Sequence, residues 1–415
     1  MNADLKQPNI KFLLITFVLL WLIIIVGYFS AQSKIESCGH RNCASSLSSA
    51  SPQTQTWPIW HGNQALTGNA YGSLPTNPVL LWRGDHPADV PSTPVMDESH
   101  IYVSSADGTL FALQRKDGSE IWRFKADGFE ASPLLLSDTL YIGALDGQFY
   151  ALEASSGSIK WIYKTDGQIA GSANYCFDET QNKTSLFVGS YDNKLHCIDS
   201  DTGKPVWVFE TDNYINGSPA VADGKVFFGG CDAHLRVLSC KTGEETVGID
   251  VGSYVPGSAA IADKRAFLGH YENKIVCIDY DKRKIVWEYG DDENGAPFFS
   301  TPAITADRIV VGGRDNNVHC IDRENGKQIW TFQTKGDVDA SPVICDGKVI
   351  VGSLDGRLYI LNLANGNKLW SYELGYPISG SPAVANGMIV IGTQGSGVFA
   401  FGVEICGLDQ GERTN

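Results

Sequence analysis

Acidic residues recur at one position of a regular pattern along this chain, and they are the first candidates for chemistry. Six of them stand three residues after a glycine, as in Gly143/Asp146 and Gly229/Asp232. Carboxylates at such spacing could hold metal ions. Most of them, however, precede Gly or Asn, and an Asp in that context stabilises a tight turn. The pattern therefore favours one hairpin turn per repeat over a metal site. The recurring acids are Asp107, Asp146, Asp192, Asp232, Glu272, Asp315 and Asp355.

Cysteine and histidine provide two further candidates. Cys197, Cys277 and Cys320 occupy a position where other copies of the pattern have alanine, which predicts small buried core residues rather than ligands. His196 and His319 replace aromatic residues at a neighbouring position. We therefore expect packed side chains there, not a paired metal site.

The other cysteines raise the question of disulfides. Cys231, Cys240 and Cys345 lie near predicted turns, and their spacing indicates no pairing. Cys38 and Cys43 lie close together in a polar segment, so a local disulfide is expected if that segment is outside the cell. Several buried free thiols are unusual in an oxidising compartment and argue against such a location. The chain has no adjacent Cys-Cys pair and no Cys-x-x-Cys-His haem motif.

A unit of about 40 residues positions these side chains and recurs eight times between residues 82 and 402. A full copy reads SPAVADGKVFFGGCDAHLRVLSCKTGEE at 218–245. Its alternating apolar segments, separated by Asp-Gly and Thr-Gly turns, predict four short strands. Each copy starts at a Ser/Thr-(Pro/Ala) step, and the starting residues are Thr93, Ser132, Ser172, Ser218, Ser258, Thr301, Ser341 and Ser381.

Four-stranded repeats of this length build β-propellers, so we predict an all-β, eight-bladed propeller. A Trp ends most copies and is expected to pack between neighbouring blades. Val247 replaces it once, which predicts a less well filled interface after the fourth copy. The chain enters the repeat at Trp82 on a lone fourth strand and leaves it at Phe401 after a third strand. The Trp82 strand should therefore complete the blade begun at Ser381.

Alignment of the eight copies indicates where a partner would bind. The residue directly before the Ser/Thr step is always small, and the residue three before it is almost always apolar. The residue between them varies: Pro91, Glu130, Ala170, Asn216, Pro256, Phe299, Asp339 and Ser379. Unlike residues on a constant scaffold, at the mouth of the propeller channel, suit a protein or peptide partner. The candidate binding residues are Glu130, Asn216, Tyr214, Tyr254, Phe299, Asp292, Glu293, Asp337, Asp339 and Tyr376; ordinary solvated loops are the alternative.

The segments outside the repeat indicate where in the cell the protein is located. Residues 12–29 carry no charge and would span roughly 27 Å as a helix, which predicts a transmembrane anchor, with a cleaved signal peptide as the alternative. Residues 1–11 would lie in the cytoplasm, and residues 30–56 form a polar linker to a propeller on the outer side of the membrane. Residues 57–402 form the propeller and 403–415 a polar tail. A net charge of −15 argues against nucleic-acid binding.

The repeat resembles the PQQ-type propeller motif Ala-x-Asp-x-x-x-Gly-x-x-x-Trp. The motif stands here as ALEASSGSIKW at 151–161 and CIDSDTGKPVW at 197–207, and WPIWHGNQALTGN at 57–69 resembles its usual leader. The resemblance covers residues 57–402. It implies the propeller fold but spans quinoprotein dehydrogenases, BamB-type assembly scaffolds and membrane-anchored proteins of other roles.

Two functions are compatible with this resemblance. A quinoprotein dehydrogenase would need a calcium site of Glu, Asn and Asp, a catalytic Asp and, commonly, adjacent cysteines against the quinone. Because this chain has no such pair and its repeats lack long insertions, we expect a membrane-anchored, monomeric, non-catalytic scaffold without a cofactor. It would bind a protein or peptide in cell-envelope assembly. A dehydrogenase using PQQ with Ca²⁺, or a sugar-binding enzyme, is the alternative.

Overall fold

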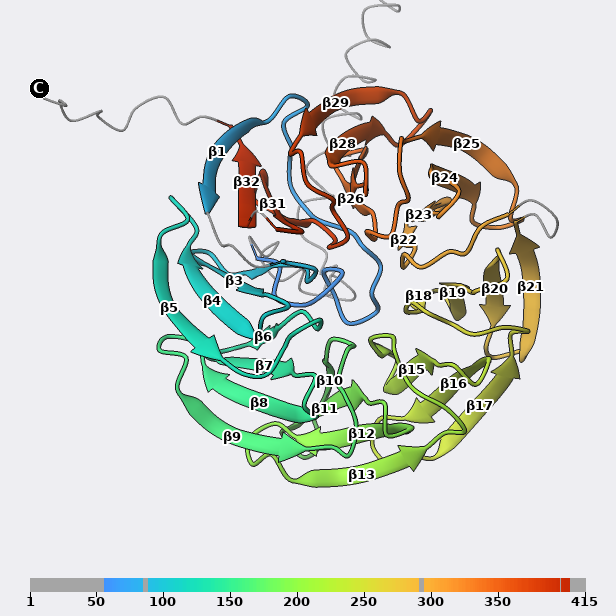
Figure 1. Ribbon diagram of the computed structural model, residues 1–415. Helices are drawn as coiled ribbons and strands as arrows, with labels where there is room; N and C mark the ends of the chain where they lie inside the picture. Colours follow the sequence, from blue (N-terminus) through green and yellow to red (C-terminus); the bar gives the residue numbers. More distant parts are fainter. Residues whose placement is uncertain (1–55, 85–88, 291–294, 396, 404–415) are drawn as a thin grey trace, which may run out of the picture. The chain divides into compact units, whose positions relative to one another are not determined.

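The computed structural model describes residues 56–84, 89–290, 295–395 and 397–403. Within these ranges the chain forms 32 strands in eight four-stranded antiparallel sheets, arranged as the blades of a propeller (Figure 1). The prediction of an all-β, eight-bladed propeller is confirmed. In the part of the chain that the structure describes, no helix is long and apolar enough to cross a membrane. The predicted anchor at 12–29 and the cysteines at 38 and 43 lie outside the described residues.

The first four blades run from Val95 to Asp250, each ordered from the channel outward. Blade 1 contains β2 (Val95–Met96), β3 (His100–Ser104), β4 (Thr109–Gln114) and β5 (Glu120–Lys125). Blade 2 contains β6 (Leu134–Leu136), β7 (Thr139–Gly143), β8 (Gln148–Glu153) and β9 (Ile159–Lys164). Blade 3 contains β10 (Asn174–Asp178), β11 (Lys183–Gly189), β12 (Lys194–Asp199) and β13 (Pro205–Glu210). Blade 4 contains β14 (Ala220–Ala222), β15 (Lys225–Gly229), β16 (His234–Ser239) and β17 (Glu245–Asp250).

The other four blades complete the ring. Blade 5 contains β18 (Ala260–Ala262), β19 (Arg265–Gly269), β20 (Ile275–Asp279) and β21 (Lys284–Tyr289). Blade 6 contains β22 (Ala303–Ile304), β23 (Arg308–Gly312), β24 (Asn317–Asp322) and β25 (Gln328–Gln333). Blade 7 contains β26 (Val343–Cys345), β27 (Lys348–Gly352), β28 (Arg357–Asn362) and β29 (Lys368–Glu373). Blade 8 contains β30 (Ala383–Ala385), β31 (Met388–Thr393), β32 (Gly397–Gly402) and β1 (Val79–Gly84).

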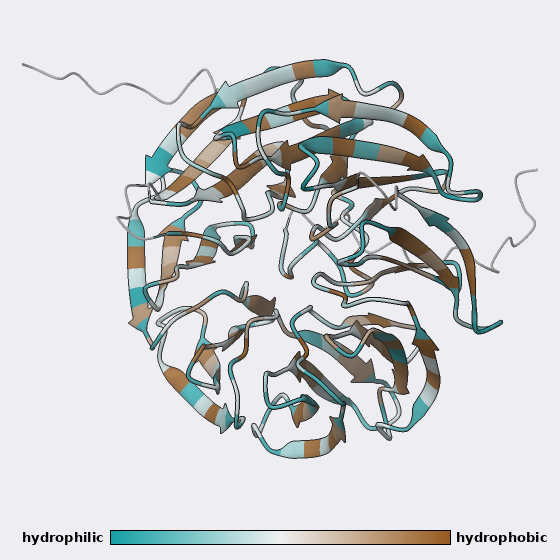
Figure 2. Cartoon of the chain, turned by 45° about the vertical axis from the view of Figure 1, so that its right-hand side comes forward, coloured by the Kyte–Doolittle hydropathy of each residue, from teal (hydrophilic) through white to brown (hydrophobic). Residues whose placement is uncertain are grey.

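Strands from both ends of the repeat close the ring in blade 8. The antiparallel pairing of β1 with β32 sets Trp82 opposite Ala400, and Figure 1 shows the two strands side by side. This confirms the predicted closure. In blade 2, for example, the middle strands are almost entirely buried, whereas the outermost strand alternates between exposed and half-buried residues. Figure 2 shows hydrophilic and hydrophobic residues alternating along outermost strands. The core therefore lies between blades, as expected for sheets packed face to face.

The Trp of one blade packs against a glycine turn of the next blade. The Trp330 indole N–H donates to the Leu363 carbonyl at 2.9 Å, and its ring covers Gly366. A Cβ on Gly366 would lie 2.7 Å from that ring, and its φ is +74°, so the turn requires glycine. The recurring glycine of the sequence motif thus serves the neighbouring blade.

The interface between blades 4 and 5 uses different residues. Val247 takes the place of the Trp and remains buried at 6% exposure. The position opposite it is Arg283 instead of glycine, with φ 54°, and its guanidinium donates to the Thr246 carbonyl at 2.9 Å. At this interface the Trp and the glycine are both replaced, because the smaller Val247 on blade 4 leaves room for the larger Arg283 on blade 5.

Residues 57–74, here called the N-terminal segment, run inside the ring along the innermost strands. The backbone carbonyls of this segment accept hydrogen bonds of 2.7–2.9 Å from the innermost strands of successive blades. The donors are the backbone N–H groups of Met96, Leu135, Val221, Ile261, Ile304 and Ile344. In blade 3 the Asn174 side chain donates to the Gln64 carbonyl at 2.7 Å instead. The segment thus joins seven of the eight blades.

Candidate functional site

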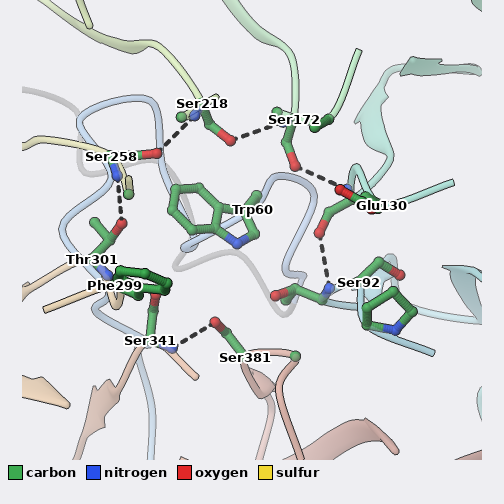
Figure 3. Close-up of a pocket in the computed structure, with 18 of the residues that line it drawn as sticks. Trp60, Ser92, Glu130, Ser172, Ser218, Ser258, Phe299, Thr301, Ser341 and Ser381 are labelled. Carbon is green, nitrogen blue, oxygen red and sulfur yellow. Dashed lines mark hydrogen bonds between the residues drawn. The ribbon is translucent and has the colours of Figure 1, made fainter. Parts of the chain in front are cut away.

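The Ser/Thr steps form a ring of hydroxyls around the channel, and this explains why they recur. The Thr93 backbone N–H donates to Ser132 Oγ of the next blade at 2.8 Å, and the same bond repeats from blade to blade (Figure 3). Seven such bonds of 2.7–3.1 Å link the described blades. These buried hydroxyls are occupied in holding blades together and are not placed as nucleophiles.

The glycines directly before the hydroxyls lie close to the backbone of the next blade. A Cβ on Gly217 would lie 2.2 Å from the Gly257 carbonyl oxygen, and one on Gly171 would lie 2.8 Å from that of Gly217. At these glycines the backbones of adjacent blades approach too closely for a side chain. The scaffold beneath the variable positions is therefore fixed by sterics.

The eight variable residues, here called the mouth ring, all line one cavity of about 190 Å³. Trp60 of the N-terminal segment lies at the centre of the hydroxyl ring in Figure 3 and lines the same cavity. The mouth ring comprises Pro91, Glu130, Ala170, Asn216, Pro256, Phe299, Asp339 and Ser379. Four of the candidate residues, Glu130, Asn216, Phe299 and Asp339, are thus brought together.

Arg314 joins two members of the mouth ring and was missed by the sequence reasoning. Its guanidinium makes a two-bond ion pair with Asp339, with Nε–Oδ1 and Nη2–Oδ2 both 2.8 Å. The same group lies 3.6 Å from the centroid of the Phe299 ring. The hydrogen bond to Asp339 raises the pKa of Arg314. The negative charge of Asp339 is therefore balanced by Arg314, and the same guanidinium covers one face of the Phe299 ring.

Arg314 belongs to a second ring of variable residues, in the turns between the second and third strands. Each backbone N–H in this ring bonds a carbonyl of the adjacent mouth loop, as in Tyr271 to Tyr254 at 2.9 Å. The ring comprises Ala106, Leu145, Tyr191, Cys231, Tyr271, Arg314, Leu354 and Gln394. In seven copies these residues stand two positions after the strand-end glycine, so the alignment that found the mouth ring could have found this one.

Aromatic side chains lie in the loops and turns of the mouth face from blade 3 to blade 6. Tyr191 and Tyr214 stack at 5.0 Å with an interplanar angle of 10°, and Tyr271 lies 5.4 Å from Phe299. Tyr214, Tyr254 and Tyr271 are 47%, 54% and 51% exposed. We call this set the aromatic arc: Tyr191, Tyr214, Tyr254, Tyr271 and Phe299.

The remaining candidates lie apart from the aromatic arc or outside the described residues. Tyr376 is 39% exposed and lies near Gly395 of blade 8. The Asp337 backbone carbonyl accepts the Leu354 N–H at 2.9 Å, which fixes its loop. Asp292 and Glu293 are outside the described residues.

The recurring acids stabilise turns, as predicted. Asp146 Oδ1 accepts the Gln148 N–H and Asp355 Oδ1 accepts the Arg357 N–H, both at 3.0 Å. Within the described ranges, no group of three or more His, Cys, Asp or Glu side chains could hold a metal ion.

The two histidines connect blades through the same acids. His196 contacts Asp192 of its own blade at 3.0 Å and the Tyr163 hydroxyl of the preceding blade at 3.0 Å. His319 repeats this arrangement with Asp315 and Tyr289. Burial lowers the pKa of His196. The expectation of packed side chains is therefore confirmed, and the sequence did not reveal the Tyr–His–Asp chain.

The comparisons with known proteins agree with this fold. Residues 75–176, 179–290 and 272–405 match the family model described as outer membrane protein assembly factor BamB. No curated protein matches the chain. BamB from Moraxella catarrhalis is 18% identical with a TM-score of 0.64, over 80% of this chain and 100% of that one.

Solved structures of other kinds share the same architecture. Quinohemoprotein alcohol dehydrogenase from Comamonas testosteroni is 14% identical with a TM-score of 0.72, over 87% of this chain and 83% of that one. The computationally designed Ika8 protein is 14% identical with a TM-score of 0.69, over 78% of this chain and 99% of that one. An assembly factor, an enzyme and a design thus have one fold, so function must be argued from the site.

Proposed function

Since the chain belongs to the BamB family of PQQ-type propellers, we propose that it is a non-catalytic binding protein whose channel mouth receives a protein or peptide segment. The observation that carries this proposal is the aromatic arc, an exposed surface next to a ring of unlike side chains on a sterically fixed scaffold. Tyr and Arg are enriched at protein interfaces, where their rigid faces contribute much of the binding energy.

The size and chemistry of the cavity support a protein partner over a small molecule. Its volume of about 190 Å³ is below the roughly 300–1,000 Å³ of typical ligand pockets. It suits one inserted side chain of a larger partner. Glu130 presents a carboxylate there and Asn216 an amide, while the carboxylate of Asp339 is already paired with Arg314.

The mouth does not fit PQQ with Ca²⁺. Glu130, Asn216 and Asp339 supply the residue types of the required calcium site, but they come from three separate loops around the ring. Asp339 is held by the Arg314 guanidinium, and the hydroxyls beneath are committed to bonds between blades. A tricarboxylate quinone would also need a larger and more cationic cavity than the mouth ring provides.

The same proposal includes the location of the protein. Residues 12–29 would anchor it in the cytoplasmic membrane, and the propeller would work as a monomer on the outer side, in assembly of the cell envelope. This part rests on the uncharged segment of the sequence and on the linker that follows it.

Site-specific photo-crosslinking in native membranes tests the proposal. A photoreactive residue at Tyr254 should give a discrete crosslinked protein, and one at Val206, equally exposed on an outer strand, should not. The product should decrease several-fold when Glu130→Gln or Arg314→Ala is added. Equal crosslinking from both positions would contradict the proposal. Saturable binding of PQQ and Ca²⁺ with dye-linked dehydrogenase activity would favour the enzyme instead.

A further inference from the structure

Two cysteines from neighbouring blades meet on the face opposite the mouth. Cys176 lies on β10 of blade 3, and Cys240 directly follows β16 of blade 4. Cys176 packs against the hydrophobic core cluster that contains Cys240 and Cys197, and Cys176 and Cys240 both line a cavity of about 520 Å³. Cys176 is half-buried, whereas Cys240 is 5% exposed.

The repeat itself explains why these two positions are neighbours. In the aligned repeats, Cys240 stands at the position that Arg115 has in blade 1. Cys176 stands at the position that Ala385 has in blade 8. There the Arg115 guanidinium reaches the Ala385 carbonyl at 2.7 Å across the blade interface. At the interface of blades 5 and 6, Arg323, at the position of Cys240, bonds Asp263, the residue directly after the position of Cys176, at 2.6 Å. The blade geometry thus brings the two positions together, and among the described interfaces only blades 3 and 4 have cysteine at both.

The local structure makes one thiol accessible and reactive. The hairpin of β10 and β11 is longer than its counterparts, and Phe177 and Lys183 of this hairpin line the cavity that reaches Cys176. The neighbouring Cys240 thiol lowers the pKa of Cys176, and Cys176 in turn raises the pKa of Cys240. Cys176 is therefore the more readily ionised of the two thiols, and the thiolate is the form that attacks disulfides.

We propose that Cys176 and Cys240 form a redox-active dithiol that is converted to a disulfide between blades 3 and 4 by exchange with a small or protein disulfide. The Cys176 thiolate attacks one sulfur of the oxidant, which forms a mixed disulfide and releases one thiolate. The Cys240 thiol loses its proton to solvent and attacks Cys176 Sγ, which releases the second thiolate. Two electrons pass to the oxidant, and the two sulfurs form a bond of about 2.05 Å.

Peptide mapping of the full-length chain in detergent tests this site. After incubation with oxidised glutathione and digestion with trypsin without reductant, residues 165–183 and 237–241 should be recovered as one joined peptide. Each of these peptides contains a single cysteine. Reductant should separate the peptides again, and Cys345→Ser should not change the yield.

Single variants separate the roles of the two thiols. Cys240→Ser should accumulate a glutathione adduct on Cys176, because the second thiol is missing. Cys176→Ser should give neither the adduct nor the joined peptide, with Cys240 unmodified. The proposal is overturned if the wild-type chain carries only an adduct on Cys176, or if Cys176 joins Cys197 of the same core cluster. The wild-type result alone decides between these outcomes if a variant does not fold.

Discussion

The two ends of the channel differ in the atoms that matter there: backbone atoms at one end and variable side chains at the other. At the end opposite the mouth, the backbone of residues 57–74 bonds the innermost strands of seven blades, so the contacts depend little on side-chain identity. At the mouth, eight side chains of different chemistry stand on a ring of small residues and a ring of hydroxyls. One end is therefore suited to holding the ring together, and the other is free to vary with the partner.

The largest effect should follow from removing residues 57–90. This deletion takes away both the N-terminal segment and β1, which leaves the edge of β32 unpaired and open to aggregation. We expect no cooperative thermal transition and a predominantly aggregated protein. Removal of residues 38–56 is the control and should leave the melting curve unchanged. Removal of residues 57–74 alone, which keeps β1, should give a folded but less stable ring.

The next largest effect concerns the interfaces between blades. Trp330→Ala should reduce the free energy of unfolding by about 3–5 kcal/mol, because the indole is buried against the glycine turn and its N–H is bonded. Val247→Ala, at the interface without the Trp–Gly pair, should cost less than half as much. Denaturant unfolding of both variants measures the difference. Equal losses would mean that the Trp positions are not the main contacts between blades.

The N-terminal segment also predicts a dependence of stability on pH. His61 is fully buried, and its Nδ1 and Nε2 lie 2.7 and 3.1 Å from the carbonyls of Leu66 and Pro342. Burial lowers its pKa from 6.5 to about 4, although both carbonyls favour the protonated ring. Between these values the unfolded chain binds a proton that the folded chain does not. The free energy of unfolding should therefore fall as pH decreases, with about 2 kcal/mol lost by pH 5.

The His61→Asn variant measures this contribution. It should be less stable than the wild type at pH 8, yet lose less stability between pH 8 and pH 5. His234→Asn, at the first residue of β16, is the matched control variant. An unchanged pH dependence in His61→Asn would show that this residue does not titrate in the acidic range.

The sequence predicted the scaffold because the scaffold is repeated. Eight aligned copies revealed the blade count, the closure by Trp82 and the positions of the mouth ring, since each constraint is visible eight times. A contact that occurs only once in the molecule leaves no recurring pattern in the aligned copies. The path of residues 57–74 and the pairing of Arg314 with Asp339 depend on how distant segments meet in space, so they needed the structure.

The smallest effect on stability is expected at the mouth ring itself. Glu130 lines the cavity, and no hydrogen bond or ion pair among the described residues joins its side chain to a neighbouring blade, so Glu130→Gln should change the free energy of unfolding by less than about 0.5 kcal/mol. The same substitution should still reduce partner crosslinking from Tyr254, because it removes a carboxylate from the proposed contact surface. Melting curves and crosslinking yields from one preparation test both. A large loss of stability would show that the mouth ring, like the channel end opposite the mouth, serves the fold. Unchanged crosslinking would place the partner elsewhere.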